Sequence, residues 1–318
     1  MNHILDRLLR DPVTPEPIDG VASWWARHQA ATSALSDSIE IAMIGGFLAD
    51  RPAWAFASAY QAALQRLLAE AALDRVGVSD PAGRKVAMCA TEEGGNHPRA
   101  IQSTLVAEPG GGYRLGGHKR WATLGSQVED LLVFASAGKD EQGRNRLAAV
   151  LVPGDRAGIT ITDIDSSEQP FVPEVAHARV ELVDVRVEPH ERLEGDGYDR
   201  YLKPFRTVED CHVHAALLAW MLQVARRSSW SDDRLEAIVA VLAALHTIAS
   251  CDPSSSATHI ALAGAIALSD EILAGQEQEW QTVDEVTRTR WQRDQALLRV
   301  AGRARSRRRE VAWQRIRD

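Results

Sequence analysis

Hydrophobic residues recur at intervals of three and four along the first part of the chain, for example at Ile39, Ala42 and Met43. This spacing places them on one face of a helix, which is typical of an amphipathic helix. The stretch that follows, from Ala55 to Leu73, is rich in Ala and Leu and contains no Gly or Pro. The pattern therefore predicts a small helical N-terminal part, which we place at residues 1–80.

The pattern changes near residue 80, where the turn-forming sequence Ser-Asp-Pro-Ala-Gly occupies residues 79–83. Short runs typical of β-strands follow, separated by turn signals. The expected strands are Lys85 to Ala90, Ser103 to Glu108, Gly112 to Leu115, Leu131 to Ser136, Arg146 to Val152, Thr160 to Ile164 and Ala176 to Val187. Seven short runs at this density predict an antiparallel barrel or sandwich, which forms a middle β-domain at residues 81–197.

A helical period returns after Gly197 and continues to the end of the chain. The expected helices are Phe205 to Arg227, Asp232 to Ser250, Ala257 to Gln278 and Val283 to Ile316. Four long amphipathic helices with short connections predict a four-helix bundle at residues 198–318. The predicted fold class is therefore α+β.

Composition narrows the functional classes. The 318 residues carry a formal net charge of −8, so no broad positive field is available for nucleic acid or an anionic membrane surface. No segment has the apolar length of a membrane span, and the N-terminus lacks a hydrophobic signal core. The three cysteines are far apart and show no metal-ligand spacing, which predicts neither a disulfide framework nor a metal site. We expect a soluble, cytoplasmic protein.

Two segments of the middle part carry the most specific pattern. Residues 89–95 read Cys-Ala-Thr-Glu-Glu-Gly-Gly, and residues 112–123 read Gly-Tyr-Arg-Leu-Gly-Gly-His-Lys-Arg-Trp-Ala-Thr. They resemble the T-E-P-G-x-G-S-D and G-x-x-x-N-G-x-K-x-W-I-T segments of acyl-CoA dehydrogenases. Residues 149–153 and 180–189 resemble two further strands of that family, in the same order. The resemblance implies a short, divergent member with an acyl-CoA dehydrogenase-like fold.

The resemblance also implies FAD as the cofactor and assigns three residues to its ring. Trp121 would pack on the isoalloxazine, Thr123 would meet N5 and Thr91 the pyrimidine edge. Because Trp121 and Thr123 are two residues apart in an expected strand, their side chains should lie on one face. From the residues alone, a Trp and a Thr buried in a β-core are the competing interpretation, since both are common in strands.

The expected phosphate-binding loop departs from the family pattern. Residues 93–98 are one residue shorter, and Asn96 or His97 stands where the family has the serine that binds pyrophosphate. Glycines here can still expose backbone N–H groups to an anion. An ordinary hairpin turn with a surface histidine is the alternative.

Acyl-CoA oxidation needs a carboxylate to remove the α-proton. Aligning on Arg293-Asp294 places Gly302 where most of the family has this base. A smaller branch carries its base on the first helix of the C-terminal part, and Glu209 fits that position. Asp210 is the fallback base. The alternative is a solvated glutamate in the first helical turn, which the helix dipole favours.

Three functions remain open at this point. The first is an FAD-dependent acyl-CoA dehydrogenase that passes electrons to an electron-transfer flavoprotein. The second is a non-catalytic subunit that needs a related chain, because Gly302 replaces the usual base and the family's R-x-x-F-G segment is missing between residues 226 and 256. The third is a flavin monooxygenase of the same fold. We expect a homodimer or homotetramer formed through the C-terminal bundle, where Trp280, Trp291 and Trp313 add apolar surface.

Overall fold

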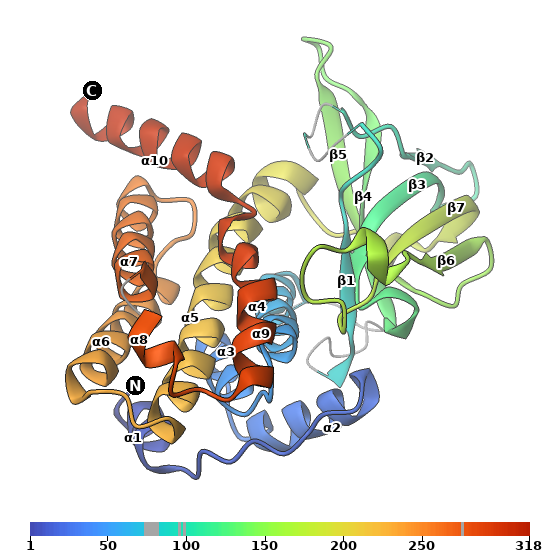
Figure 1. The fold of residues 1–318 in the computed structure, drawn as a ribbon. Coiled ribbons are helices and arrows are strands. Elements are labelled where there is room, and N and C mark those ends of the chain that lie inside the picture. Colours follow the sequence, from blue (N-terminus) through green and yellow to red (C-terminus); the bar gives the residue numbers. More distant parts are fainter. Residues whose placement is uncertain (73–82, 95–96, 98–99, 275–276) are drawn as a thin grey trace. The chain divides into compact units, whose positions relative to one another are not determined.

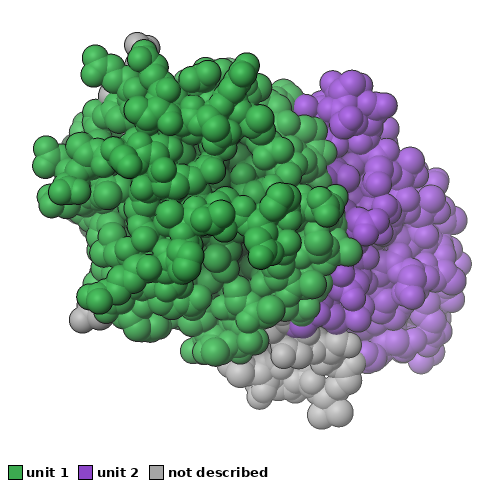
Figure 2. Space-filling view, turned by 60° about the horizontal axis from the view of Figure 1, so that its bottom comes forward, with its two compact units in different colours: residues 1–63, 170–174, 206–318 green, residues 64–169, 175–205 purple. Residues whose placement is uncertain are grey.

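The computed structural model describes residues 1–318 except 73–82, 95–96, 98–99 and 275–276 (Figure 1). Two compact units are coloured in Figure 2. Unit 1 comprises residues 1–63, 170–174 and 206–318, and unit 2 comprises residues 64–169 and 175–205. Along the chain, helices are followed by strands and then by helices, as the α+β fold class predicts. The predicted domain boundary near residue 80 lies outside the described residues, and the three-part division remains a prediction.

The N-terminal helices are α1 (Asn2–Arg10), α2 (Val21–Thr32), α3 (Ser38–Phe47) and α4 (Pro52–Ala72). Helix α3 begins after Asp37, whose side chain accepts a hydrogen bond from the backbone N–H of Ile39 and so caps the helix. Gly46 allows close packing within unit 1, since a Cβ at this position would lie 2.2 Å from the carbonyl oxygen of Ala216. The position therefore requires glycine.

The C-terminal helices are α5 (Lys203–Arg227), α6 (Asp232–Ala249), α7 (Ser256–Ala274), α8 (Glu277–Trp280), α9 (Glu285–Asp294) and α10 (Gly302–Arg317). The first three agree with the predicted helices. The fourth prediction, a single helix over Val283 to Ile316, is wrong, because a 3-10 turn at Gln295–Arg299 separates α9 from α10. The break begins at Asp294, whose buried carboxylate accepts a hydrogen bond of 2.8 Å from the backbone N–H of Val172.

Four tryptophans form a continuous series of ring contacts inside unit 1, two of them stacked and one edge-to-face. The Trp220 and Trp291 rings lie 5.6 Å apart, the Trp291 and Trp280 rings 5.8 Å, and the Trp280 and Trp230 rings 5.6 Å. Trp291 is therefore a core residue and Trp280 packs against it. Of the three tryptophans proposed to form an assembly surface, only Trp313 is largely exposed, at 41%. Assembly remains a prediction, but Trp280 and Trp291 no longer support it.

Unit 2 is built on one seven-stranded sheet. Its strands are β1 (Val86–Cys89), β2 (Thr104–Ala107), β3 (Tyr113–Thr123), β4 (Asp130–Lys139), β5 (Asn145–Pro153), β6 (Ile159–Asp163) and β7 (His177–Val187). The order is β1-β4-β2-β3-β7-β6, with β5 paired to β4. The seven predicted strands are all present. Pairing is mixed rather than wholly antiparallel, because β4 runs parallel to β1 and meets β2 in parallel at one position.

Burial along the strands explains their places in the sheet. In β4, Leu131 to Ala135 are fully buried, which is typical of a strand covered on both faces. In β7, Ala178, Val180 and Leu182 are buried and alternate with exposed residues, as expected for a strand with one covered face. A bulge interrupts the alternation in β7 at Asp184, which has a φ of 51°, and the alternation resumes with buried Val185 and Val187.

Among the described residues, none of the helices combines the length and apolar character that crossing a membrane would require.

Candidate flavin and acyl-CoA site residues

Strand β3 presents Trp121 at an irregularity of the sheet. Lys119 pairs with Val180 and Ala122 with Ala178, so two residues of β3 lie opposite one residue of β7. Trp121 is one of the two and has a φ of 65°, a strained value for a residue with a large side chain. This β-bulge interrupts the regular alternation on which the predicted shared face of Trp121 and Thr123 depends.

The bulge leaves the indole of Trp121 accessible. Its side chain is 37% exposed, although most tryptophans of this chain are buried, whereas Thr123 is 5% exposed. The His177 ring approaches the indole edge-on at 6.0 Å, and the Arg120 guanidinium lies 5.0 Å from the ring centre. Burial lowers the pKa of His177, so its imidazole is neutral near pH 7. An accessible indole fixed by neighbours on two sides can receive a planar ligand ring.

The structure brings two of the predicted flavin segments together. The backbone N–H of Arg120 donates to the carbonyl oxygen of Thr91 at 2.9 Å, which places Thr91 beside the residue preceding Trp121. His97 is exposed, and its carbonyl accepts a hydrogen bond from the N–H of Ala100. Asn96, the other predicted phosphate ligand, lies outside the described residues. The flavin roles of these residues remain predictions.

A buried ion pair holds this region in place. The Nζ of Lys119, with no exposed side-chain surface, donates to Oε1 of Glu92 at 2.6 Å and to the carbonyl oxygen of Phe134 at 2.6 Å. Glu92 also accepts from the backbone N–H groups of Gln102 and Ser103 and from the Ser103 hydroxyl. Lys119 therefore ties β3 to β4 and to the segment after Thr91.

The motif comparison assigned no role to Lys119 or Glu92, although both stand in the quoted segments. A signal was available: Leu115, Gly117 and Lys119 alternate along β3, and Leu115 is an inward-facing residue. A lysine in phase with an inward leucine predicts a buried cation that needs a carboxylate partner.

A cavity of about 890 Å³ lies beside these residues in unit 2. Its lining includes Glu93 and Gly94 of the predicted phosphate loop and side chains from three neighbouring strands: His118, Arg120, Thr160, Thr162, Arg179 and Glu181. Arg120 and Arg179 both donate to Glu168, at 3.2 and 3.3 Å. The cavity is large enough for a cofactor-sized ligand.

Glu209 lies on α5 in unit 1 and is partly exposed. Burial of the carboxyl group, followed by repulsion from the Asp210 charge, raises the pKa of Glu209 to about 7. A carboxyl group with this pKa exists in both protonation states near neutral pH, as a general base requires. The raised pKa agrees with the predicted role but does not assign it.

Asp210 is engaged elsewhere. One of its oxygens accepts from Arg305 at 2.7 Å and the other from Arg308 at 2.6 Å, so two guanidiniums of α10 bind this buried carboxylate. The acid is on α5 and both arginines are on α10, so the ion pairs join these two helices. Both oxygens of Asp210 already accept from guanidinium groups, so Asp210 is the less suitable of the two candidates.

We expect Arg308→Gln to lower the free energy of unfolding by about 1.5–3 kcal/mol, because the variant removes a charge-assisted hydrogen bond to a buried carboxylate. Denaturant unfolding measures the change. Arg309→Gln, which alters the exposed neighbour on the same helix, should shift stability by at most ~0.5 kcal/mol. Equal changes in both variants would mean that the ion pair with Asp210 contributes little.

Two histidines of α5 that follow Asp210 are engaged or buried, and the position of Gly302 is open. Both ring nitrogens of His212 are engaged, with the carbonyl oxygen of Val208 at 2.7 Å and the Ser38 hydroxyl at 2.9 Å. His214 is fully buried, and this burial lowers its pKa to about 3. Gly302 begins α10, and a Cβ there would meet no atom within 4 Å. The position aligned with the usual base thus has room for a side chain but carries none.

Comparisons with known proteins agree with this architecture. Residues 87–181 match the acyl-CoA dehydrogenase middle domain. The probable acyl-CoA dehydrogenase YngJ of Bacillus subtilis (strain 168) is 30% identical over 159 residues, which are 50% of this chain and 38% of that protein. The chain thus spans well under half the length of this curated relative.

Solved structures match most of the chain. A crystal structure of an FAD-dependent dehydrogenase has a TM-score of 0.74 at 16% identity and covers 99% of this chain and 97% of its own. Butyryl-CoA dehydrogenase from Megasphaera elsdenii has a TM-score of 0.67 at 13% identity, with 91% and 85% coverage. Residues 87–181 thus match an acyl-CoA dehydrogenase middle domain, and most of the chain shares the fold of solved acyl-CoA dehydrogenase-like structures.

Proposed function

We propose that this protein is a flavin-dependent oxidoreductase that oxidises an acyl-CoA thioester between Cα and Cβ. The observation that carries the proposal is the accessible Trp121 at the β-bulge of the matched middle domain, in the strand that also holds Thr123. The known relatives include proteins described as acyl-CoA and butyryl-CoA dehydrogenases.

In the proposed reaction, the carboxylate of Glu209 takes the α-proton of the thioester as a general base. A bound flavin supplies the acceptor for the hydride that leaves Cβ. Trp121 orients the flavin ring, and the Thr123 hydroxyl donates a hydrogen bond to it. We assign FAD as the cofactor, an electron-transfer flavoprotein as the electron acceptor, and a homodimer or homotetramer as the assembly.

The experiment has two steps. The absorbance of the purified protein shows whether flavin is bound, and chromatography of the released cofactor distinguishes FAD from FMN. Anaerobic titration with acyl-CoA thioesters of increasing chain length then reports flavin reduction by loss of the visible flavin absorbance. Bleaching by a thioester supports the proposal. Bound flavin that no thioester reduces, but that consumes oxygen with an external reductant, favours a monooxygenase.

A second candidate is a non-catalytic subunit, and Gly302 is the observation that favours it. The position aligned with the usual base lacks a carboxylate and has open space around it. Flavin reduction by acyl-CoA in a Gly302→Glu variant, with none in the unmodified chain, would favour this function over the first.

We expect Trp121→Ala to lower the flavin content of the purified protein, because the variant removes the ring that packs on the cofactor. The measurement is the ratio of flavin to protein absorbance after gel filtration. The control needs a tryptophan as exposed as Trp121, and Trp313, which is 41% exposed, meets this requirement. Trp230 is only 5% exposed, so its replacement would disturb the core. Equal flavin content in the Trp121→Ala and Trp313→Ala variants would refute the placement of the ring.

A further inference from the structure

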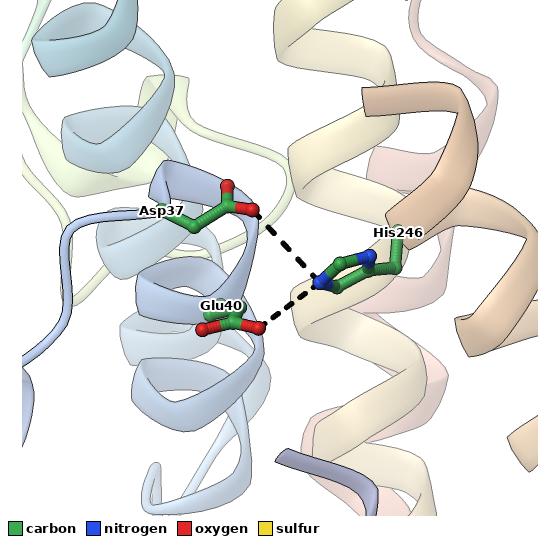
Figure 3. Close-up of side chains that lie close together, drawn as sticks. All are labelled: Asp37, Glu40 and His246. Carbon is green, nitrogen blue, oxygen red and sulfur yellow. Dashed lines mark hydrogen bonds and ion pairs between the residues drawn. The ribbon is translucent and has the colours of Figure 1, made fainter. Parts of the chain in front are cut away.

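Unit 1 contains a cluster of two carboxylates and a histidine that the proposed reaction does not use (Figure 3). Asp37 caps α3, Glu40 lies in the first turn of the same helix, and His246 lies in the last turn of α6. One ligand atom from each residue lies within 4.8 Å of the others. His246 lies more than two hundred positions after the two carboxylates in sequence, so no local spacing motif reveals the cluster.

The side chains converge on one point. Nε2 of His246 lies 3.0 Å from Oε1 of Glu40 and 3.9 Å from Oδ2 of Asp37, as Figure 3 shows. The other oxygen of Asp37 accepts from the N–H of Ile39, which fixes the carboxylate and leaves Oδ2 directed toward the histidine. A second histidine, His3 of α1, places its Nε2 3.3 Å from Oε2 of Glu40.

The charge around Glu40 differs from that around the other buried carboxylates. Its side chain is 9% exposed, and the partners that the described structure gives it are two imidazoles and the α-amino group of Met1, at 3.3 Å. Glu92, Asp210 and Asp294 each face a lysine or an arginine. Among the described residues, neither Asp37 nor Glu40 has a lysine or arginine partner, so a divalent cation could balance the charge of these two carboxylates.

The donor set and spacing fit a transition metal. Imidazole nitrogen and carboxylate oxygen are the usual protein ligands of Zn²⁺, which bonds to them at about 2.1 Å. Two ligands of a tetrahedral site at that bond length lie about 3.4 Å apart. The separations of 3.0 and 3.9 Å between Nε2 of His246 and the facing oxygens of Glu40 and Asp37 bracket this value. Calcium and magnesium prefer sites made of oxygen atoms alone, so the histidines disfavour them.

We propose that Asp37, Glu40 and His246 form a binding site for a divalent transition metal of the zinc class. His3 serves as the fourth ligand, and its 63% exposed side chain can turn toward the ion. The ion would cross-link α3 to α6 through three side chains and draw in α1 through His3. Its role is structural, because none of the four residues belongs to the proposed reaction.

The test uses the untagged full chain, stripped with a chelator and titrated with Co²⁺ and with Zn²⁺. Cobalt bound by nitrogen and oxygen ligands gives d–d absorption without the thiolate charge-transfer band, which excludes the exposed Cys251 as a ligand. We expect one ion per chain. At a free zinc concentration about 100 times Kd, the folding equilibrium constant should rise about 100-fold, seen as a higher melting temperature.

Asp37→Asn is the decisive variant, because asparagine caps a helix as well as aspartate does but removes a charged metal ligand. It should keep the melting temperature of the metal-free protein and weaken metal binding at least about tenfold. His246→Gln should do the same, while His259→Gln on α7 is the control and should bind as the unmodified chain does. Absence of a bound ion, or equal binding by Asp37→Asn, His246→Gln and His259→Gln, overturns the proposal.

Discussion

Replacing Lys119 by methionine should lower the free energy of unfolding by about 3–5 kcal/mol, because the variant leaves a buried carboxylate without its cation. The lysine side chain has no exposed surface and the Glu92 side chain is 9% exposed, so water cannot replace the lost partner. The hydrogen bond to the Phe134 carbonyl is lost as well. Denaturant unfolding followed by circular dichroism measures the change.

Two controls separate this effect from lost packing. Lys85→Met breaks the ion pair with Glu129, whose side chain is 37% exposed, and should cost at most ~1 kcal/mol. Adding Glu92→Gln to Lys119→Met should recover part of the loss, because a neutral amide removes the unpaired charge. If the double variant is less stable than Lys119→Met alone, the penalty does not arise from the charge of Glu92.

The strand pattern was predictable because each strand carries its own hydrophobic signal, but β3 extends further than expected. The prediction ended at Leu115, before Gly116 and Gly117. In the structure Gly117 lies inside the strand with a φ of 140°, and a Cβ there would lie 2.2 Å from the Ser103 hydroxyl oxygen. This glycine permits the close approach of another segment, and nothing in the local sequence distinguishes that role from a turn.

Features that depend on distant residues were not predictable from local patterns. The parallel pairing of β1 with β4 joins segments more than forty residues apart, and period-two patterns carry no information on strand direction. The break between α9 and α10 begins where Asp294 binds a backbone amide 122 residues earlier in the chain. The pairing of Asp210 with α10 has the same origin: helical spacing placed the carboxylate on α5 but did not identify its partners.

For the candidate site residues too, local sequence predicted the positions but not the contacts with distant residues. The motif resemblance selected Trp121 and Thr123 correctly as residues of one strand, and the structure adds the bulge that exposes the indole. For the base, the sequence left two adjacent carboxylates open. Arg305 and Arg308 make them unequal, because they bind Asp210 and leave Glu209 as the carboxyl group with a raised pKa.

Glu209→Gln should therefore slow acyl-CoA-driven flavin reduction by about 10²–10⁴-fold while leaving flavin bound, because the amide keeps the shape of the side chain but cannot accept the α-proton. Stopped-flow absorbance under anaerobic conditions measures the rate. Glu236→Gln, the same change at an exposed position on α6, is the matched control and should reduce at the unmodified rate.

The pH dependence gives an independent readout of the same group. Since only the ionised carboxylate accepts a proton, the reduction rate of the unmodified protein should rise as the pH passes through the Glu209 pKa of about 7 and level off above it. Glu209→Gln should lose this rise, and Asp210→Asn should keep a rise because the titrating base is intact. Its midpoint should fall, since removing the neighbouring negative charge lowers the Glu209 pKa. If the rise with pH disappears in Asp210→Asn and persists in Glu209→Gln, the base is Asp210. That result would contradict the assignment drawn from the ion pairs of Asp210 with Arg305 and Arg308.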